Sequence, residues 1–253
     1  LNLPEATPPK FALSGRVGFG GAVALDLAIN NLRASDEPAL AALIGGVRGA
    51  LNARVALRLD EPATPDAPGA LHATVEATMK GLRAGGVRAR RVHMNGTVAG
   101  TTADPRMDVR VAATELVETA SGLRSSQTTV HAVGGLRDVT VDLESQLPRS
   151  RVVQLHARAR ERDGTWRAGV TGTAGGEQHP WNLQVDDLAY AIESGDLRVG
   201  RAAFAHMDSR LELQGAMRGS GRLSAELRFE EFAVHDLLAA LAIPIQGFEA
   251  TLG

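Results

Sequence analysis

The sequence predicts a mainly β protein, built as a long antiparallel sheet with one or two short helices. Apolar and polar residues alternate with period two along nearly the whole chain, Gly-rich turn signals separate the alternating runs, and helical patterning occurs only twice. Successive side chains of a strand point to opposite faces, so this alternation produces a sheet with one apolar and one polar face. We expect a dozen or more strands.

The clearest strands are the runs 51–59 and 71–79, in which every second residue is apolar. The other alternating runs are 11–19, 23–29, 92–98, 107–113, 139–143, 153–159, 166–170, 181–185, 188–192 and 223–229. Turn signals fall between these runs at hairpin spacing, and Asp163-Gly164 is the strongest because it separates two clearly alternating segments. Others are Gly20-Gly21, Gly85-Gly86, Gly134-Gly135, Gly175-Gly176 and Ser194-Gly195-Asp196. A meander of neighbouring antiparallel strands is the simplest consequence.

Helices are expected at only two places, 37–44 and 236–241, where Ser35, Asp36 and Asp236 are suitable capping residues. The stretch 60–69 contains three prolines and predicts a loop. The alternation resumes beyond this loop, which predicts one continuous unit over residues 1–253. Because the sequence begins at Leu1 and stops in mid-pattern, we interpret it as part of a longer protein.

An apolar sheet face must be buried against something, and the sequence offers hardly any helix to cover it. The sheet is therefore expected to fold on itself as a two-sheet sandwich, a closed barrel or a trough with an apolar interior. Packed sandwiches normally use aromatic residues to fill the space between their sheets. Here aromatic residues make up 4% of the chain, and the inward positions are mostly Ala, Val and Leu, which leaves room inside.

The apolar register defines a set of residues that we expect to share one interior surface and to line a lipid groove. They are Leu51, Val55, Leu57, Leu71, Val75, Met79, Val139, Val141, Leu143, Val153, Leu155, Leu223, Leu227 and Phe229. Each CH₂ group transferred from water to such a lining gains ~0.8 kcal/mol. Acyl chains of phospholipids could therefore be shielded without any specific contact to the headgroup.

Composition and motif spacing disfavour most other chemistries. The net charge of −2 disfavours nucleic acid as a partner, and the absence of Cys removes thiol and zinc-thiolate chemistry. No apolar run approaches the ~20 residues of a membrane span. The histidines show no metal-ligand spacing, and Asp186-Asp187 should point to opposite faces unless a bulge intervenes. The sequence thus predicts a protein that is not an enzyme and has no metal or cofactor.

One basic cluster stands out, formed by Arg83, Arg88, Arg90 and Arg91. Arginines of this kind can contact lipid phosphates, so Arg88, Arg90 and Arg91 are candidate headgroup contacts at the mouth of the groove. The alternative is a charged strand that prevents edge-to-edge aggregation.

Two features give the chain a family resemblance. The strand, Leu-Ala-Ala-Leu and Gly-containing exit of residues 27–49 recurs at 227–247, and residues 92–109 hold a strand, Gly100-Thr101-Thr102-Ala103-Asp104-Pro105 and a second strand. This phrasing resembles TamB and its AsmA-like relatives along nearly the whole chain. It lies in repeated phrases and includes no catalytic signature. The N-terminal membrane anchor and the C-terminal partner-binding end of that family have no counterpart here.

The resemblance implies a periplasmic protein of a Gram-negative envelope, anchored in the inner membrane by a segment outside this sequence. It implies a β-taco sheet whose groove moves or shields phospholipids between the two membranes, or supports outer-membrane protein assembly with a TamA-like barrel partner. The alternative function is a β-sandwich module for carbohydrate binding or adhesion. That alternative requires a packed core and a surface aromatic platform.

Overall fold

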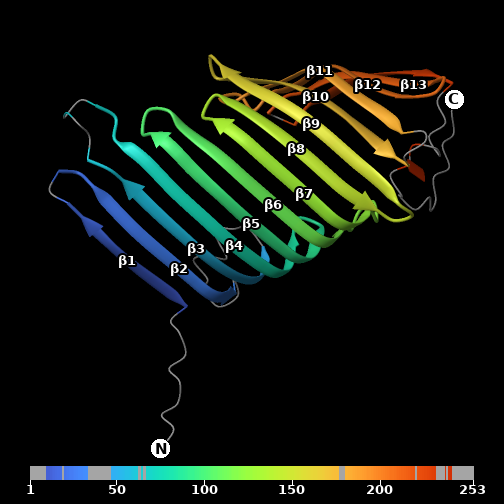
Figure 1. Cartoon of the computed structure of the whole chain (residues 1–253). Coiled ribbons are helices and arrows are strands. Elements are labelled where there is room, and N and C mark those ends of the chain that lie inside the picture. The colour runs from blue at the N-terminus through green and yellow to red at the C-terminus, as the bar shows by residue number, and fades with distance from the viewer. Residues whose placement is uncertain are drawn as a thin grey trace, which may run out of the picture. The chain divides into compact units, whose positions relative to one another are not determined.

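The computed structural model describes residues 10–18, 20–33, 47–61, 64, 67–176, 180–219, 221–231, 237 and 239–240. These residues form a sheet of 14 strands in which every strand is hydrogen-bonded to its neighbours in the chain, in the order β1 to β14 (Figure 1). The printed strand pairs are all antiparallel. The sheet is not closed, since β1 and β14 are the two ends of this order. The predicted mainly β, antiparallel fold is confirmed.

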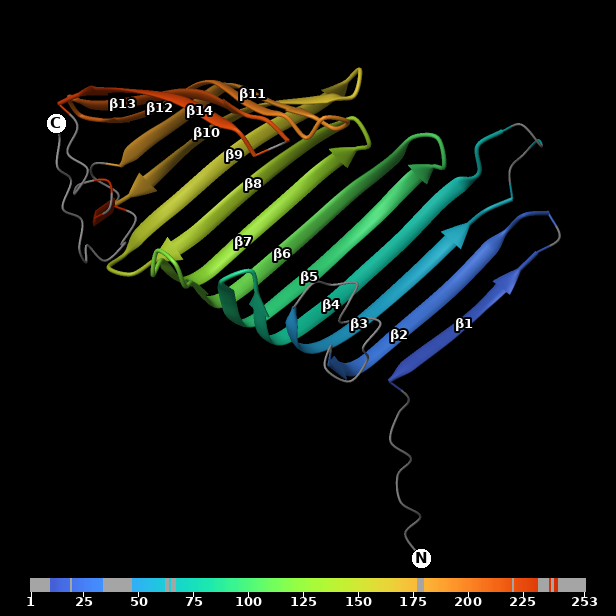
Figure 2. The same ribbon diagram turned by 180° about the vertical axis from the view of Figure 1, so that it is seen from behind.

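The strands of the first half are β1 (Phe11–Val17), β2 (Val23–Arg33), β3 (Arg48–Leu59), β4 (Ala70–Ala84), β5 (Val87–Thr101), β6 (Pro105–Glu118) and β7 (Arg124–Gly135). Those of the second half are β8 (Asp138–Leu147), β9 (Arg151–Arg162), β10 (Thr165–Gly175), β11 (Trp181–Ala191), β12 (Leu197–His206), β13 (Ser209–Met217) and β14 (Leu223–Glu230). The same succession of strands is seen from behind in Figure 2.

The chain divides into two compact units, Leu1–Thr114 and Glu115–Gly253, which we call unit 1 and unit 2. Strands β1 to β5 belong to unit 1 and β7 to β14 to unit 2, while β6 crosses the boundary. Within each unit, the substantial contacts between described elements are those between successive strands. Each unit is therefore described as a single β layer.

Turn chemistry explains several of the hairpins. Gly85 and Gly86 join β4 to β5 with φ angles of 52° and 84°, and Asp163-Gly164 joins β9 to β10 with φ of 52° and 73°. Two successive positive φ angles are the requirement of the type I′ hairpin turn, which Gly and Asp meet at low cost. Both turns lie where the sequence predicts them. Gly134-Gly135, by contrast, ends β7, and the bend follows at Leu136-Arg137.

Other details differ from the sequence-based expectations. The separate runs 181–185 and 188–192 are one strand, β11, and the strands β7, β12 and β13 had no counterpart among the predicted runs. The predicted helix at 37–44 lies outside the described residues. Of the predicted helix at 236–241, the structure describes Leu237, Ala239 and Ala240, which are helical, and the rest of that segment lies outside the described residues.

Little of the described chain is fully buried. The buried apolar side chains are Leu32, Ala89, Ala113, Leu147, Trp181 and Ala202. A compact domain of this length would bury far more, because its sheet would be covered by a second layer. The apolar side chains of both units are instead mostly half-buried against their neighbours on the same face.

Candidate functional site: the apolar faces

The apolar face of unit 2 consists of cross-strand rows that run from β7 to β14. Residues that pair across antiparallel strands share a face, and their Cβ atoms lie about 5 Å apart. One row, here the central row, is Ala132, Val141, Ala157, Val170, Val185, Ala202, Leu213 and Leu227. Every member of this row is apolar, so no polar group interrupts it over all eight strands.

Two further rows flank the central row on the same face. On one side lie Val130, Leu143, Leu155, Gly172, Leu183, Phe204, Leu211 and Phe229. On the other side lie Gly134, Val139, Ala159, Ala168, Leu188, Val199, Gly215 and Ala225. The three rows form one continuous apolar surface made almost entirely of aliphatic residues and glycine.

Unit 1 repeats this arrangement over β1 to β5. Its rows include Phe11, Ile29, Ala53, Ala77 and Met94; Leu13, Leu27, Val55, Val75 and Gly96; and Val17, Val23, Leu59, Leu71 and Gly100. The exposed positions between these residues are largely polar, as in β4, where odd-numbered residues from Leu71 to Met79 are half-buried and the intervening ones are mostly exposed. The predicted alternation is therefore clear in β4, whereas β1 is exposed along its whole length.

Of the predicted lining residues, Leu51, Leu57, Met79, Val153 and Leu223 belong to cross-strand rows other than those named above, and the others lie in the named rows. The whole set forms two groups that belong to different units. Leu51, Val55, Leu57, Leu71, Val75 and Met79 are half-buried in unit 1, and Val139, Val141, Leu143, Val153 and Leu155 are half-buried in unit 2. The remaining three, Leu223, Leu227 and Phe229, are 70%, 49% and 56% exposed. Their partners on β13 have the expected register, and they are exposed because β14 has a neighbour on one side only.

One end of the unit 2 face is more enclosed than the rest. Trp181 is 2% exposed and stacks on His206, with ring centroids 5.0 Å apart. Leu147 is also buried there, and the guanidinium of Arg151 donates a hydrogen bond to the carbonyl of Ala239. The half-buried helical residues near Ala239 thus lie against the start of β9. Sequence reasoning missed Trp181 as an anchor, although its size made it the obvious candidate.

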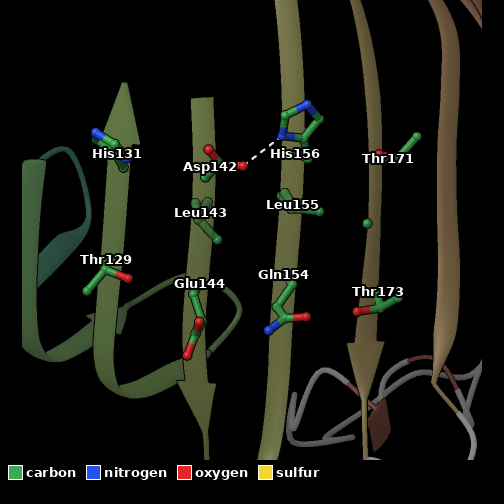
Figure 3. A pocket seen from close by; sticks show the side chains of 11 residues that line it. Thr129, His131, Asp142, Leu143, Glu144, Gln154, Leu155, His156, Thr171 and Thr173 are labelled. Carbon is green, nitrogen blue, oxygen red and sulfur yellow. Dashed lines mark hydrogen bonds and ion pairs between the residues drawn. The ribbon is translucent and has the colours of Figure 1, made fainter. Parts of the chain in front are cut away.

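The polar face of unit 2 carries a shallow hollow of about 440 Å³ over β7 to β10 (Figure 3). Polar side chains from two cross-strand rows surround it: His131, Asp142, His156 and Thr171, then Thr129, Glu144, Gln154 and Thr173. A similar hollow of about 450 Å³ in unit 1 involves Asp26, Arg54, Thr74 and Glu76. Both hollows therefore open among polar side chains, and each is also lined by members of an apolar row: Leu143, Leu155 and Gly172 in unit 2, and Leu27, Val55 and Val75 in unit 1.

The His156 and Asp142 pair in the first hollow is the nearest approach to a catalytic arrangement. The two atoms Nδ1 and Oδ1 are 2.7 Å apart, and the side chains are 55% and 58% exposed. A general base also needs a nucleophile or an acidic proton within hydrogen-bond reach. Among the described residues, Asp142 is the one side chain shown in contact with His156. The arrangement corresponds to a solvent-exposed surface hydrogen bond between the two side chains.

The adjacent carboxylates Asp186 and Asp187 lie at a bulge, where the pairing of β10 with β11 shifts register between Val185 and Leu188. Asp187 accepts from Arg167 at 3.4 Å, and Asp186 accepts from the amide of Gln184 at 2.6 Å. The bulge that cooperation between the two would require is therefore present. Each carboxylate, however, is occupied by a partner of its own, which favours a structural role.

Several ion pairs also connect neighbouring side chains on the C-terminal part of this polar face. Arg201 and Arg210 lie 2.6 and 2.7 Å from the same Oε1 of Glu212. The hydrogen bond from Arg201 lowers the pKa of Glu212, and the same bond raises the pKa of Arg201. Gln214 likewise lowers the pKa of Glu226 by donating a hydrogen bond to it. Both carboxylates therefore have polar partners on the same face.

Of the basic residues singled out by the sequence, Arg88, Arg90 and Arg91 are exposed on β5 and Arg83 is exposed on β4. Arg91 pairs with Lys80, whereas the next pair, Val92 with Met79, belongs to the apolar register. Arg91 thus lies on the face opposite the apolar rows. The edge-protection interpretation is wrong, because β4 and β5 lie inside the strand order with a neighbour on each side.

The residues that carry the family resemblance have a structural role in the hairpin between β5 and β6. The hydroxyl of Thr101 accepts a hydrogen bond from the backbone N–H of Asp104 at 3.1 Å, and the Thr101 N–H donates to the Asp104 carbonyl. Gly100 has a φ of 123°, which favours glycine. The phrase is therefore a turn signal.

The described part of the chain was also searched for metal sites and for membrane-spanning helices. It contains no group of three or more His, Asp or Glu residues placed to hold a metal ion. No helix in that part is long and apolar enough to cross a membrane. Comparison of the chain with protein-family models, with curated proteins and with solved structures found no match.

Proposed function

We propose that this protein is a non-enzymatic lipid-binding protein whose apolar faces shield phospholipid acyl chains and let them move along the sheet. The observation that carries the proposal is the uninterrupted central row of unit 2, apolar on all eight strands. In a soluble domain such a surface would be covered by a second layer. Here it is only half-buried, and large exposed apolar patches mark binding surfaces.

The dimensions suit an acyl chain. Eight strands spaced about 4.8 Å apart give a surface on the order of 34 Å long. Transfer of each CH₂ group onto it would contribute ~0.8 kcal/mol. Because the rows consist of similar small aliphatic residues, binding is expected to be nearly uniform along the sheet. Uniform affinity favours sliding over storage at one tight site.

The finer parts of the proposal come from the resemblance to TamB and AsmA-like proteins. They are a sheet curled into a β-taco-like trough with the apolar faces inside, a periplasmic location with an inner-membrane anchor outside this sequence, and transfer of phospholipid between the two membranes. Assembly of outer-membrane proteins with a TamA-like partner belongs to the same proposal. The alternative of a carbohydrate-binding sandwich is less well supported, because neither described unit has a second sheet packed on the first.

The test places a charge in the middle of each apolar face. Val141→Arg in unit 2 and Val75→Asp in unit 1 should each reduce crosslinking to a phospholipid that carries a photoreactive acyl chain by about tenfold or more. Both side chains are half-buried, so the new charge stays hydrated, and thermal stability should change little. Thr74→Asp is the matched control, since Thr74 is exposed in the polar register next to Val75.

Two outcomes would overturn the proposal. One is an absence of crosslinking to the wild-type protein when its fold is intact. The other is severe destabilisation by both Val141→Arg and Val75→Asp, because only a sealed, dry core would bury the introduced charges unpaired.

A further inference from the structure

Unit 1 carries a group of cations on its polar face that sequence reasoning recognised only in part. Arg48 pairs with Arg83, and Arg83 pairs with Arg88, so three arginines lie side by side across β3, β4 and β5. In the neighbouring row, Arg33 pairs with Ala50, Ala50 with Lys80, and Lys80 with Arg91. All six cations are exposed. We call this set the basic ladder: Arg33, Arg48, Lys80, Arg83, Arg88 and Arg91.

This arrangement of like charges opposes folding, so the stability of the sheet does not explain it. Like charges directly opposite each other on neighbouring strands are destabilising. Within the described residues, no ion pair to a carboxylate is seen for any member of the ladder. The chain from Ala77 to Ala103 contains no Asp or Glu at all. The repulsion is therefore not relieved within this part of the sheet.

Unit 2 provides a direct comparison. Arg160 and Arg167 also pair across two strands, but Arg160 has Asp138 opposite it on β8. Arg167 lies 3.4 Å from an oxygen of Asp187. The other like-charged pair of the described register thus has carboxylates beside it, whereas no described carboxylate forms an ion pair with the basic ladder.

From these observations we infer that the basic ladder is a docking site for an anionic phospholipid membrane surface. The six cations extend over β2 to β5, about 14 Å at 4.8 Å per strand, which exceeds the size of one phosphate group and matches an array of headgroups. Arginine binds phosphate oxygens with paired, charge-assisted hydrogen bonds. Each Lys or Arg close to an anionic membrane adds to binding, and the effect is screened by salt.

The composition of the same strands argues against nucleic acid. Proteins that bind single strands stack the bases on aromatic side chains. Strands β2 to β5 contain no Phe, Tyr or Trp. The overall net charge of −2 conceals the ladder, because the compensating carboxylates lie elsewhere in the sequence.

The docking site does not depend on the proposed lipid groove, since the ladder lies in the polar register and the acyl-binding rows in the apolar register. The protein would contact a membrane through the polar face of unit 1 and leave the apolar rows free. A failure of one proposal would therefore leave the other standing, and Arg83→Gln/Arg88→Gln should not alter acyl crosslinking at Val141.

The test is cosedimentation of the full chain with vesicles of phosphatidylcholine alone or with 30% phosphatidylglycerol. We expect binding only to the anionic vesicles, weakened strongly as salt rises from 50 to 300 mM. Arg83→Gln/Arg88→Gln should lose about 30-fold in affinity. Arg160→Gln/Arg167→Gln removes the same net charge from unit 2 and should lose less than about threefold. Arg83→Lys/Arg88→Lys keeps the charge and should retain most of the binding.

Several results would overturn the inference. They are equal losses from the two Gln double variants, equal binding to neutral and anionic vesicles, or tighter binding of a short single-stranded oligonucleotide than of the vesicles at the same ionic strength. Displacement by millimolar inorganic phosphate at constant ionic strength would show a free phosphate site instead. Circular dichroism checks that Arg83→Gln/Arg88→Gln is folded. This variant should be at least as stable as the wild type, because it removes repulsion between like charges.

Discussion

Unit 1 and unit 2 have the same apolar pattern on one face of their strands. On the other face, they differ in the signs of the charged residues that lie opposite each other on neighbouring strands. In unit 2, opposite charges meet across strands, as in Asp138 with Arg160, Arg210 with Glu230 and Glu212 with Arg228. In unit 1, Arg54 lies opposite Glu76, but the pairs Arg48 with Arg83, Arg83 with Arg88 and Lys80 with Arg91 have the same sign. The one such pair in the printed register of unit 2 is Arg160 with Arg167. The apolar rows of both units are mostly aliphatic, and they are mostly half-buried except on the end strands β1 and β14, whose side chains are exposed.

This difference shows that the strand register constrains the apolar face more strictly than the polar face. A cross-strand row stays apolar only if every strand keeps its register, because a slip by one residue would exchange the two faces. The polar face is free of that constraint, so its charges can vary from one unit to the next. We therefore expect the apolar faces to have the same role in both units and the polar faces to have different roles.

The largest expected effect tests whether the units are energetically separate. Trp181 in unit 2 and Leu32 in unit 1 are each 2% exposed. Replacement by Ala removes a buried side chain and should cost ~3–5 kcal/mol for Trp181→Ala and ~2–5 kcal/mol for Leu32→Ala. In sheets whose strands contact only their neighbours, such losses should stay local.

Amide hydrogen exchange read by mass spectrometry measures this locality. Trp181→Ala should lower protection mainly in β9 to β13, and Leu32→Ala mainly in β1 to β4. Leu183→Ala is a suitable comparison for Trp181→Ala, since Leu183 is only half-buried on the same strand and its loss should be smaller. An equal loss of protection in both units from either variant would contradict the division into two units.

Much of the fold could be predicted because period-two alternation and turn residues are local signals. The hairpins at Gly85-Gly86 and Asp163-Gly164 lie where the sequence places them. Strand β12 was missed because Ala202, Ala203, Phe204 and Ala205 interrupt the alternation. Strand β13 was missed although Leu211, Leu213 and Met217 follow period two. The single strand β11 was divided in two because the bulge at Asp186-Asp187 shifts the period by one residue.

The candidate sites were predicted less completely, for a physical reason. The apolar rows follow from the register of each strand, so the residues of β3, β4, β8 and β9 could be named in advance. The basic ladder depends on which residues pair across strands, and Arg48 lies 35 positions before Arg83 in the sequence. Net charge and charge runs carry no information about such pairing.

A second prediction compares glycines in equivalent rows. A Cβ at Gly172 in unit 2 would meet the backbone carbonyl of Gln154 and lie 2.6 Å from Cδ2 of Leu155. A Cβ at Gly96 in unit 1 would lie 3.0 Å from Cγ2 of Val109, a side chain that can move. Gly172→Ala should therefore cost ~1–3 kcal/mol, measured by urea unfolding, and Gly96→Ala less. The reverse order would show that the two rows are packed differently from the structure.

The third prediction tests the charge difference itself. At low salt, Arg83→Gln should raise the melting temperature by about 1–3 °C, because it removes repulsion from two neighbours. Arg167→Gln should lower it by a similar amount, because Asp187 loses its partner. Both shifts should vanish at high salt, where surface charges are screened. A lower melting temperature for Arg83→Gln would mean that the ladder is neutralised within the chain.

The smallest expected effect concerns the turn that opens unit 2. The carboxylate of Glu118 accepts hydrogen bonds from the backbone N–H groups of Ala120 and Ser121, at 2.8 and 2.6 Å, and from the Ser121 hydroxyl. These bonds, the one from the Ser121 hydroxyl above all, lower the pKa of Glu118 below its ordinary value of 4.5. A carboxyl group with a depressed pKa in the folded state stabilises the protein above its unfolded pKa, and this contribution is lost as the pH falls below about 4.5. Glu118→Gln should therefore flatten part of the acid side of a melting-temperature curve between pH 3 and 6. Ser121→Ala should flatten less of it, because the two backbone donors remain. If neither variant changes the acid slope, the turn contributes nothing to the pH dependence of unit 2.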